Sequence, residues 1–351
     1  MKRLARTALL LVAAACASSG HGGHGSDGTA AGASGANPGP TWQAAHGREH
    51  PAVGRVLDVA TRRWLDEAAL LDALAAADLV LVGERHDHPD HHVLQARIVR
   101  GLVARGRRPA VAFEMLDADD AAPLAAALAT PGDVAARAEA VRRAVAWDES
   151  GWPAWALYAP VFEAALAAGL PVVAANLARG ERHALGHGAA AALPPARRAA
   201  LGLDAPADPA ERRALAEQIR EVHCGHAPEA ALDRMVDVQR AWNAQLARAL
   251  ADARATPGSD GSAVLVAGNE HVRRDRGAPR ALARFAPDAR LAAVGLLEVD
   301  PGAPLALPEA PPPGDLPFDY VWWTPRLDLE DPCEKFRESL ESMDAERRRR
   351  R

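Results

Sequence analysis

Five unbroken runs of apolar residues, separated by segments with helical spacing, dominate the pattern of this chain. The runs cover residues 78–84, 109–115, 170–176, 262–268 and 290–299. Continuous apolar strands of this length indicate a parallel sheet that is covered on both faces. The pattern therefore predicts a three-layer α/β/α fold with a mainly parallel sheet, and we place this α/β domain at residues 48–300.

The stretch between the third and fourth core strands is much longer than a single crossover helix requires. Two segments within it, 209–222 and 228–254, have the apolar spacing of helices. We therefore predict a helical insertion at about residues 180–256, which covers the carboxyl edge of the sheet as a lid. A further helical stretch is predicted at 118–143, between the second and third core strands.

Each predicted strand ends in a polar or glycine-containing turn. In open α/β sheets, ligands bind at the carboxyl ends of the strands. This rule puts Glu84, Glu114, Asn176 and Asn269 along one edge of the sheet.

The first sixteen residues have the pattern of an export signal. Basic residues precede the short apolar run 8–15, which Cys16 follows directly. The run is too short to span a membrane and is typical of a secretory signal peptide. A cysteine after three alanines resembles a bacterial lipobox, so we expect acylation of Cys16 in an exported protein of the cell envelope. The anchor would lie in the outer membrane or on the outer face of the cell membrane, and a cleaved signal without lipid is the alternative.

Composition sets further limits on the function. Residues 17–47 are rich in glycine, serine and alanine and are predicted to form a flexible linker. Residues 301–351 are expected to form a proline-rich wrap with a basic tail. The net charge is −5, so we expect no nucleic-acid partner. Three cysteines do not describe a disulfide framework.

The densest polar cluster, GERHDHPDHH, follows the first strand at residues 83–92. Pro89 suits the first turn of a helix, and Gln95 lies three residues after His92, so these two side chains project from one face. Imidazoles and carboxylates at a strand end can bind a transition metal, ligate haem iron or move protons, and a solvated loop is the plain alternative.

A second turn repeats this arrangement. Gly268-Asn269-Glu270-His271 follows the fourth strand, as Gly83-Glu84-Arg85-His86 follows the first. Two Gly-x-x-His turns on one sheet are predicted to point His86 and His271 into a single cleft, where they could bind a divalent metal together with Glu84.

A family resemblance rests on these and other segments. LVGERHDHPDHHVLQ and AGNEHVRRDRGAP resemble the two signatures of ChaN-like haem-binding proteins. The segments FEM, WDESGWPAWALYAPVFEAA, PVVAANLAR, HCGHAPEA, DYVWWTPR and DPCEKF occur in matching order, so the likeness covers about residues 53–337. It departs from the family pattern at Trp242-Asn243, where an acidic residue is expected, and after Met115, where a glutamine is expected.

The resemblance implies that this chain is a surface-tethered protein associated with haem or iron uptake. The fold that it implies is a three-layer core with a helical insertion. It also implies haem bound through a tyrosine, as a face-to-face pair at a homodimer contact, and an uptake partner of unknown identity. Of the two tyrosines, Tyr158 is the better candidate because it precedes a predicted helix near the insertion. Further candidate cofactor contacts are His92, Gln95, Asn176, Arg179, Asn269, His223 and His226.

The wider superfamily keeps a second function open. It includes erythromycin-esterase-like hydrolases and Tiki-like metal-dependent peptidases, by likeness to which Glu84, His86, Glu114 and His271 form a catalytic or metal-binding group. Arg179 then serves either as an oxyanion donor or as an ordinary ion-pair residue. The segment 223–226, HCGH, is either a metal or haem site or a helix end with a buried cysteine. A scaffold without a working site is the third alternative.

Overall fold

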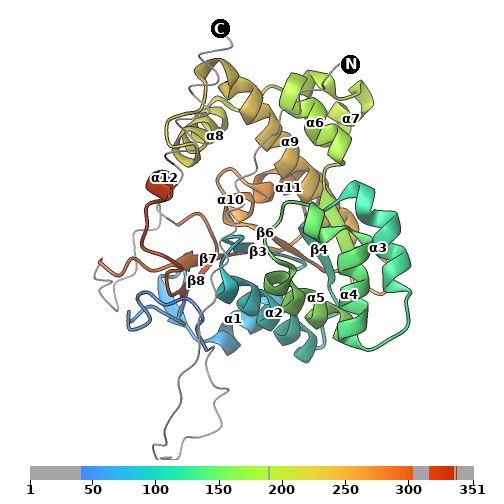
Figure 1. The fold of residues 1–351 in the computed structure, drawn as a ribbon, viewed down its shortest axis with the longest axis vertical. Coiled ribbons are helices and arrows are strands. Elements are labelled where there is room, and N and C mark those ends of the chain that lie inside the picture. The colour runs from blue at the N-terminus through green and yellow to red at the C-terminus, as the bar shows by residue number, and fades with distance from the viewer. Residues whose placement is uncertain (1–40, 189, 303–315, 336, 338–351) are drawn as a thin grey trace, which may run out of the picture.

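One eight-stranded sheet organises the chain in the computed structural model, which describes residues 41–188, 190–302, 316–335 and 337 (Figure 1). The strands are β1 (Val56–Asp58), β2 (Arg63–Leu65), β3 (Leu79–Glu84), β4 (Ala110–Asp117), β5 (Val172–Asn176), β6 (Ala263–Gly268), β7 (Leu291–Glu298) and β8 (Tyr320–Thr324). Their order across the sheet is β2-β1-β8-β7-β3-β6-β4-β5. The strands from β8 to β5 run parallel, whereas β1 pairs antiparallel with both β2 and β8. The predicted α/β fold with a mainly parallel sheet is thus confirmed.

The five predicted strands are all present, as β3 to β7, and their bounds shift by one or two residues. Three strands were missed. β1 and β2 contain only three residues each, which leaves no readable period. β8 (YVWWT) follows the proline-rich segment and extends the sheet beside β7.

The helices are α1 (Glu67–Ala75), α2 (Pro89–Ala104), α3 (Ala121–Leu128), α4 (Val134–Ala144), α5 (Trp155–Ala167), α6 (Arg179–Gly188), α7 (Pro195–Leu201), α8 (Pro209–Val222), α9 (Glu229–Ala253), α10 (Asn269–Val272), α11 (Ala278–Phe285) and α12 (Pro332–Lys335). Short 3₁₀ turns lie at Ala118–Asp120, Trp147–Glu149 and Ala190–Ala192. Helices cover both faces of the sheet, which gives the predicted three layers (Figure 1).

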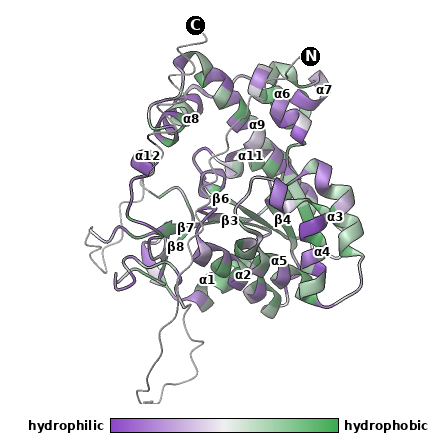
Figure 2. Cartoon of the chain, viewed as in Figure 1, coloured by the Kyte–Doolittle hydropathy of each residue, from purple (hydrophilic) through white to green (hydrophobic). Residues whose placement is uncertain are grey.

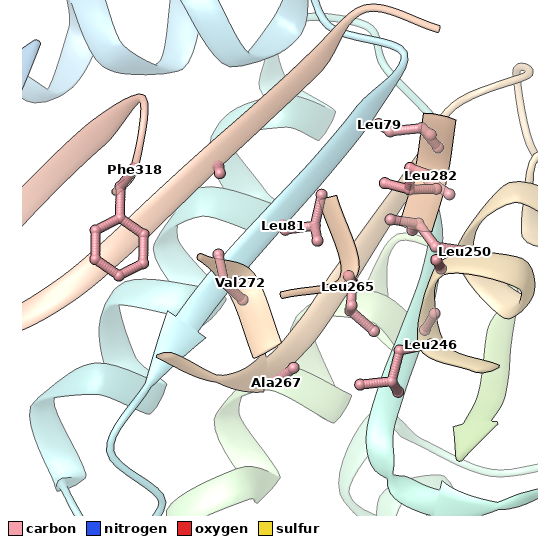
Figure 3. Close-up of a cluster of buried hydrophobic side chains, with 14 of the residues drawn as sticks. Leu79, Leu81, Leu246, Leu250, Leu265, Ala267, Val272, Leu282 and Phe318 are labelled. Carbon is pink, nitrogen blue, oxygen red and sulfur yellow. The ribbon is translucent and has the colours of Figure 1, made fainter. Parts of the chain in front are cut away.

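Alternation along the strands divides the core between the two faces. Leu79 and Leu81 of β3 pack with Leu246 and Leu250 of α9 and with Leu282 of α11 (Figure 3). Since neighbouring strand residues point to opposite faces, Val80 and Val82 meet the other layer, where they pack with Leu94, Ile98 and Leu102 of α2. The central strands are accordingly hydrophobic along their length, and the outer helices carry hydrophilic stretches (Figure 2).

The prediction of one long helix over 118–143 was wrong. The chain forms a 3₁₀ turn, then α3 and α4, which residues 129–133 separate. Gly132 has φ +149°, outside the helical range, and Asp133 caps α4 by accepting a hydrogen bond from the backbone N–H of Ala136 at 2.8 Å. Pro131 precedes this break and cannot donate a helical hydrogen bond.

The predicted insertion between the third and fourth core strands is present as α6 to α9, which lie between β5 and β6 in the chain (Figure 1, upper part). The predicted helices at 209–222 and 228–254 correspond to α8 and α9. One disulfide joins Cys224, in the connection between α8 and α9, to Cys333 of α12. The sequence did not predict this bridge, because a single bridge across 109 residues leaves no spacing pattern.

The predicted N-terminal and C-terminal segments lie largely outside the described residues. These include the signal with Cys16, the linker as far as residue 40, residues 303–315 of the proline-rich wrap and the basic tail. The end of the predicted linker belongs to the folded domain, because the backbone N–H groups of Gln43 and Ala44 donate to Asp90 at 2.7 and 2.9 Å. Within the described ranges, the helices are too short or too polar to cross a membrane.

Candidate functional site

The two Gly-x-x-His turns lie side by side at the carboxyl edge of the sheet. β3 and β6 are neighbours, and Glu84 pairs in register with Gly268. Each turn uses its glycine to accommodate the other turn. A Cβ on Gly83 would lie 2.1 Å from the Asn269 side-chain oxygen, and one on Gly268 would lie 3.0 Å from the His86 ring. The sequence pattern therefore predicted the convergence of the two turns correctly.

Glu84 is the hub of the first half of the site. Its Oε1 accepts a hydrogen bond from the Tyr158 hydroxyl at 2.6 Å and lies 2.8 Å from Nδ1 of His86. Its Oε2 accepts from Nε2 of Gln95 at 2.7 Å and lies 3.3 Å from Nδ1 of His92. The carboxylate is buried, and these four side chains replace the water that it has lost.

The charges in this half reinforce one another. Burial by itself would raise the pKa of Glu84, but the charge and hydrogen bonds of His92 and His86 outweigh burial and hold the pKa well below its ordinary value. Burial would lower the pKa of His86, yet the hydrogen bond to Glu84 and the nearby charge of Glu114 raise it to about 9. Near neutral pH, Glu84 and His86 therefore form an ion pair.

Glu114 is the hub of the second half. Its Oε2 accepts from the backbone N–H of Gly268 at 2.8 Å, and its Oε1 lies 3.3 Å from Nε2 of His271. Nδ1 of His271 donates to the side-chain oxygen of Asn243 at 2.7 Å, while the Asn243 amide donates to the carbonyl of Arg276. Burial would raise the pKa of Glu114, but the charge and hydrogen bond of His271 outweigh it and lower this pKa.

The two halves meet at Glu114 and differ in exposure. The charge of His86 also lowers the pKa of Glu114. Both side chains lie next to Gly268: a Cβ built on this glycine would be 3.0 Å from the His86 ring and 3.7 Å from the Glu114 carboxylate. The side chain of His86 is 37% exposed, whereas that of His271 is 10% exposed. A ligand that approaches from solvent therefore meets His86 first. We call Glu84, His86, Tyr158, Glu114 and His271 the rim cluster.

Most histidines of the GERHDHPDHH segment serve the fold. His88 caps α2 by accepting from the backbone N–H of Asp90, and its ring stacks on that of His91 at 3.9 Å. Nε2 of His91 lies 3.1 Å from the Thr324 hydroxyl of β8. Burial and the neighbouring imidazoles His88 and His92 hold the pKa of His91 well below its ordinary value, so this ring is neutral.

His92 and Gln95, both predicted as cofactor contacts, form the buried layer behind Glu84. Nε2 of His92 lies 3.0 Å from the carbonyl of His86, and Nδ1 lies 3.2 Å from the side-chain oxygen of Gln95. Both side chains are almost completely buried. They position the carboxylate of Glu84 and the turn that carries His86.

The predicted asparagines and Arg179 bind protein groups. The side-chain amide of Asn176 donates to the carbonyl of Glu114, and its oxygen accepts from the backbone N–H of Leu177. Asn269 donates to the carbonyl of Leu296 at 2.7 Å. Arg179 pairs with Asp117 at 2.9 Å and with Asp120 at 2.5 Å, so of its two predicted roles the structure has the ion pair.

Cys224 and His223 of the HCGH segment contact groups outside the rim cluster. Cys224 is in the disulfide, so it offers no thiolate to a metal or to haem iron, which corrects that alternative. Nδ1 of His223 lies 2.7 Å from the carbonyl of Ile219 in α8. His226 lies in the connection between α8 and α9.

The predicted divalent-metal site of Glu84, His86 and His271 is not supported. No group of three or more histidine, cysteine or acidic side chains within the described ranges is arranged to hold a metal ion. The physical reason is that Glu84 is saturated by donors from Tyr158, His86 and Gln95, while His271 faces Glu114.

Sequence analysis missed the role of Asn243, which holds His271. A signal was available, because Asn243 shares a helical stripe with the buried Leu246 and Leu250, where a polar side chain needs a buried partner. Two half-buried indoles flank the site. The ring of Trp152 lies 5.0 Å from that of His86, and the ring of Trp242 lies 5.3 Å from that of His271.

Comparison with known proteins identifies this arrangement. The sequence model of the family described as "Haem-binding uptake, Tiki superfamily, ChaN" matches residues 70–282, a range that contains the whole rim cluster. The chain belongs to this family. ChaN of Campylobacter jejuni, solved with cofacial haem, has the same fold at 22% identity and a TM-score of 0.57, over 76% of this chain and 95% of that one.

Two weaker structural matches were found. The erythromycin esterase EreC, in its open conformation, matches with 14% identity and a TM-score of 0.38, over 68% of this chain and 76% of that one. The type III effector HopBA1 matches with 14% identity and a TM-score of 0.37, over 73% of this chain and 91% of that one. A search of curated proteins finds no match.

The residues of the rim cluster can be tested against the haem that the family name implies. Haem iron requires an accessible axial ligand, such as histidine or tyrosine, and a flat apolar surface suits the macrocycle. Tyr158 does not fit, because it lies inside the first turn of α5 rather than before a helix, is 0% exposed and donates to Glu84. His86 fits, because it is exposed beside Trp152 and its Nε2 makes no hydrogen bond among the described residues.

Proposed function

We propose that this chain binds haem at its rim cluster and serves haem or iron uptake at the cell envelope. The observation that carries the proposal is the family match over residues 70–282, which spans all five residues of the cluster. The fit of His86 to an iron ligand supports the same conclusion. When bound, haem supplies an iron centre, and the residues of this chain hold it, orient it and shield it from water.

Titration of the purified domain with haemin tests this function. We expect a Soret band that differs from that of free haemin and saturates at micromolar protein, as measured by absorbance. The same titration with an unrelated acidic protein of similar size is the control. A spectrum that stays equal to that of free haemin throughout would disprove haem binding.

Export and lipid anchoring at Cys16 are part of the proposal. The Cys224–Cys333 disulfide supports export, because such bonds persist in oxidising compartments and are rare in the cytosol. Labelling cells with a radioactive fatty acid tests the anchor. The wild-type chain should be found in the membrane fraction and carry the label. The Cys16→Ser chain should carry no label and should be absent from the membrane fraction. Equal labelling of the two chains would refute acylation at Cys16.

A homodimer that holds a face-to-face haem pair is also proposed, by analogy with the family. Sedimentation of the domain with and without haemin tests this assembly. We expect one haem per chain and a dimer in the presence of haemin. A haem-saturated monomer would contradict the paired arrangement while leaving haem binding intact.

A second candidate function is hydrolysis without a metal ion. The observation that favours it is the pair of carboxylate–imidazole contacts, Glu84 with His86 and Glu114 with His271, which could move protons at one place. A panel of ester and peptide substrates tests it with His86→Ala and His271→Ala. Hydrolysis by the wild-type chain that both variants lose would support this function, and unchanged hydrolysis in both would exclude it.

A further inference from the structure

We propose that His86, and not a tyrosine, is the axial ligand of the haem iron in this chain. The inference rests on the proposed haem-binding function and names the side chain through which that function operates. It departs from the tyrosine ligation that the family resemblance implies.

The two tyrosines of the chain are both engaged elsewhere. Tyr158 has no exposed surface, its hydroxyl donates to Glu84 at 2.6 Å, and its ring packs against those of His92 and Trp147. Ligation by Tyr158 would therefore require removal of this side chain from the core and loss of a buried hydrogen bond.

Tyr320 lies away from the rim cluster. It begins β8, which is separated from β3 by β7, and it packs in the cluster of side chains that includes Trp42 and Leu65. No contact of Tyr320 with the rim cluster occurs within the described residues. Tyr158 is therefore the one tyrosine of the rim cluster, and it is completely buried.

His86 has the geometry of a prepared ligand. Its Nδ1 lies 2.8 Å from the Glu84 carboxylate, which fixes the ring, and binding of iron at Nε2 would release to solvent the proton that this nitrogen carries in the Glu84–His86 ion pair. Metal-ligating histidines almost always donate their other ring N–H in this way, often to a carboxylate, and the contact makes the ligating nitrogen more basic. Glu84 and Tyr158 are then positioning residues, because they act on the iron through His86.

Exposure distinguishes His86 from the other histidines of the rim. His88, His91 and His92 are completely buried, and His271 is 8% exposed and held between Asn243 and Glu114. His86 presents 37% of its side chain to solvent. The half-buried indole of Trp152 beside it offers a flat apolar surface for the macrocycle.

Absorbance, electron paramagnetic resonance and resonance Raman spectra of the haemin complex test the ligand. The wild-type chain should give histidine-type spectra without tyrosinate ring vibrations. The double variant Tyr158→Phe/Tyr320→Phe contains no tyrosine and should keep the same type of spectrum, even if the loss of the Tyr158 hydrogen bond weakens binding. A tyrosinate signature in the wild-type chain that disappears in this variant would overturn the inference.

The complementary variant is His86→Gly. We expect its haemin dissociation constant to rise at least about tenfold, and added imidazole to restore the histidine-type spectrum. Circular dichroism establishes that the variant is folded, and His86→Gln provides a second replacement if it is not. A folded His86→Gly or His86→Gln chain with unchanged affinity and spectrum would overturn the inference.

A matched control is His183→Ala, which removes an exposed histidine of α6 outside the rim cluster. This variant should retain the affinity and spectrum of the wild-type chain, and loss of the spectrum here would assign the ligand to α6. A wild-type chain that binds no haemin defeats the proposed function, whereas a chain that binds haemin independently of His86 defeats the inference alone.

Discussion

The ring of His86 occupies the space that a side chain at position 268 would need. A Cβ on Gly268 would lie 3.0 Å from both Cε1 and Nε2 of His86, although these residues are far apart in the chain. The backbone of Gly268 has φ −58°, a value that any residue can adopt, so the glycine is required by space and not by conformation. The two turns are therefore fitted to each other.

Gly268→Ala should disturb both turns. We expect it to lower the free energy of unfolding by about 1–3 kcal/mol, because the His86 ring cannot move without straining its contact with Glu84. Urea unfolding measures this loss, and haemin titration should show weaker binding. Gly180→Ala is the control, since an added Cβ there meets no atom within 4 Å and should cause no loss. Equal stability of the Gly268→Ala and wild-type chains would show that the fit is loose.

The ion pair of Glu84 and His86 predicts a pH dependence in the haem-free chain. The pKa of His86 rises from 6.5 to about 9 on folding. Its contribution to stability is therefore complete below about pH 6.5 and is lost as the pH rises through about 9. The stability difference between the wild-type chain and His86→Gln should shrink over this range in urea unfolding. A constant difference between the wild-type and His86→Gln chains over this range would contradict the raised pKa.

Asn243→Ala should destabilise the second half of the site. The change leaves the carbonyl of Arg276 without its partner and removes the short hydrogen bond of Nδ1 of His271, and an unsatisfied buried group costs about 1–3 kcal/mol. Thermal and urea unfolding measure this effect. Gln239→Ala removes a longer, 3.4 Å contact with the same histidine and should cost less. The reverse order of the two variants would show that Asn243 does not hold His271.

Removal of the disulfide should loosen the helical insertion. Cys333→Ser breaks a bridge between residues 109 positions apart, and loss of a disulfide typically costs about 2–4 kcal/mol. Thermal unfolding with and without reductant measures this, and the reductant should affect the wild-type chain but not the variant. Cys16→Ser should leave the bridge intact in peptide mapping. Two free thiols at Cys224 and Cys333 in the wild-type protein, purified without reductant, would contradict the bridge.

The parts of the fold that the sequence predicts are those with local signals. The five core strands are unbroken apolar runs. α8 begins at Pro209, and proline is favoured in the first turn of a helix. β1 and β2 depend on pairing between distant segments and are too short to show a period. The helix over 118–143 was predicted too long because a strong alanine pattern outweighed the Pro131-Gly132 break.

The candidate site also contains features that a local sequence signal predicts and features that depend on distant packing. The two Gly-x-x-His turns were found because each directly follows a strand, and strand ends share an edge. The contact of Tyr158 with Glu84 depends on how α5 packs on α2 across 74 residues, which no local pattern records. For this reason Tyr158 was predicted to face a ligand, whereas it supports the carboxylate from within the core.

The position of Cys333 has a consequence for the biogenesis of this protein. Cys333 follows β8 in the chain, so Cys224 cannot form this bridge until all the described strands of the sheet have been synthesised. The covalent closure of the insertion is thereby a late maturation step, which can only follow the synthesis of the last strand of the sheet.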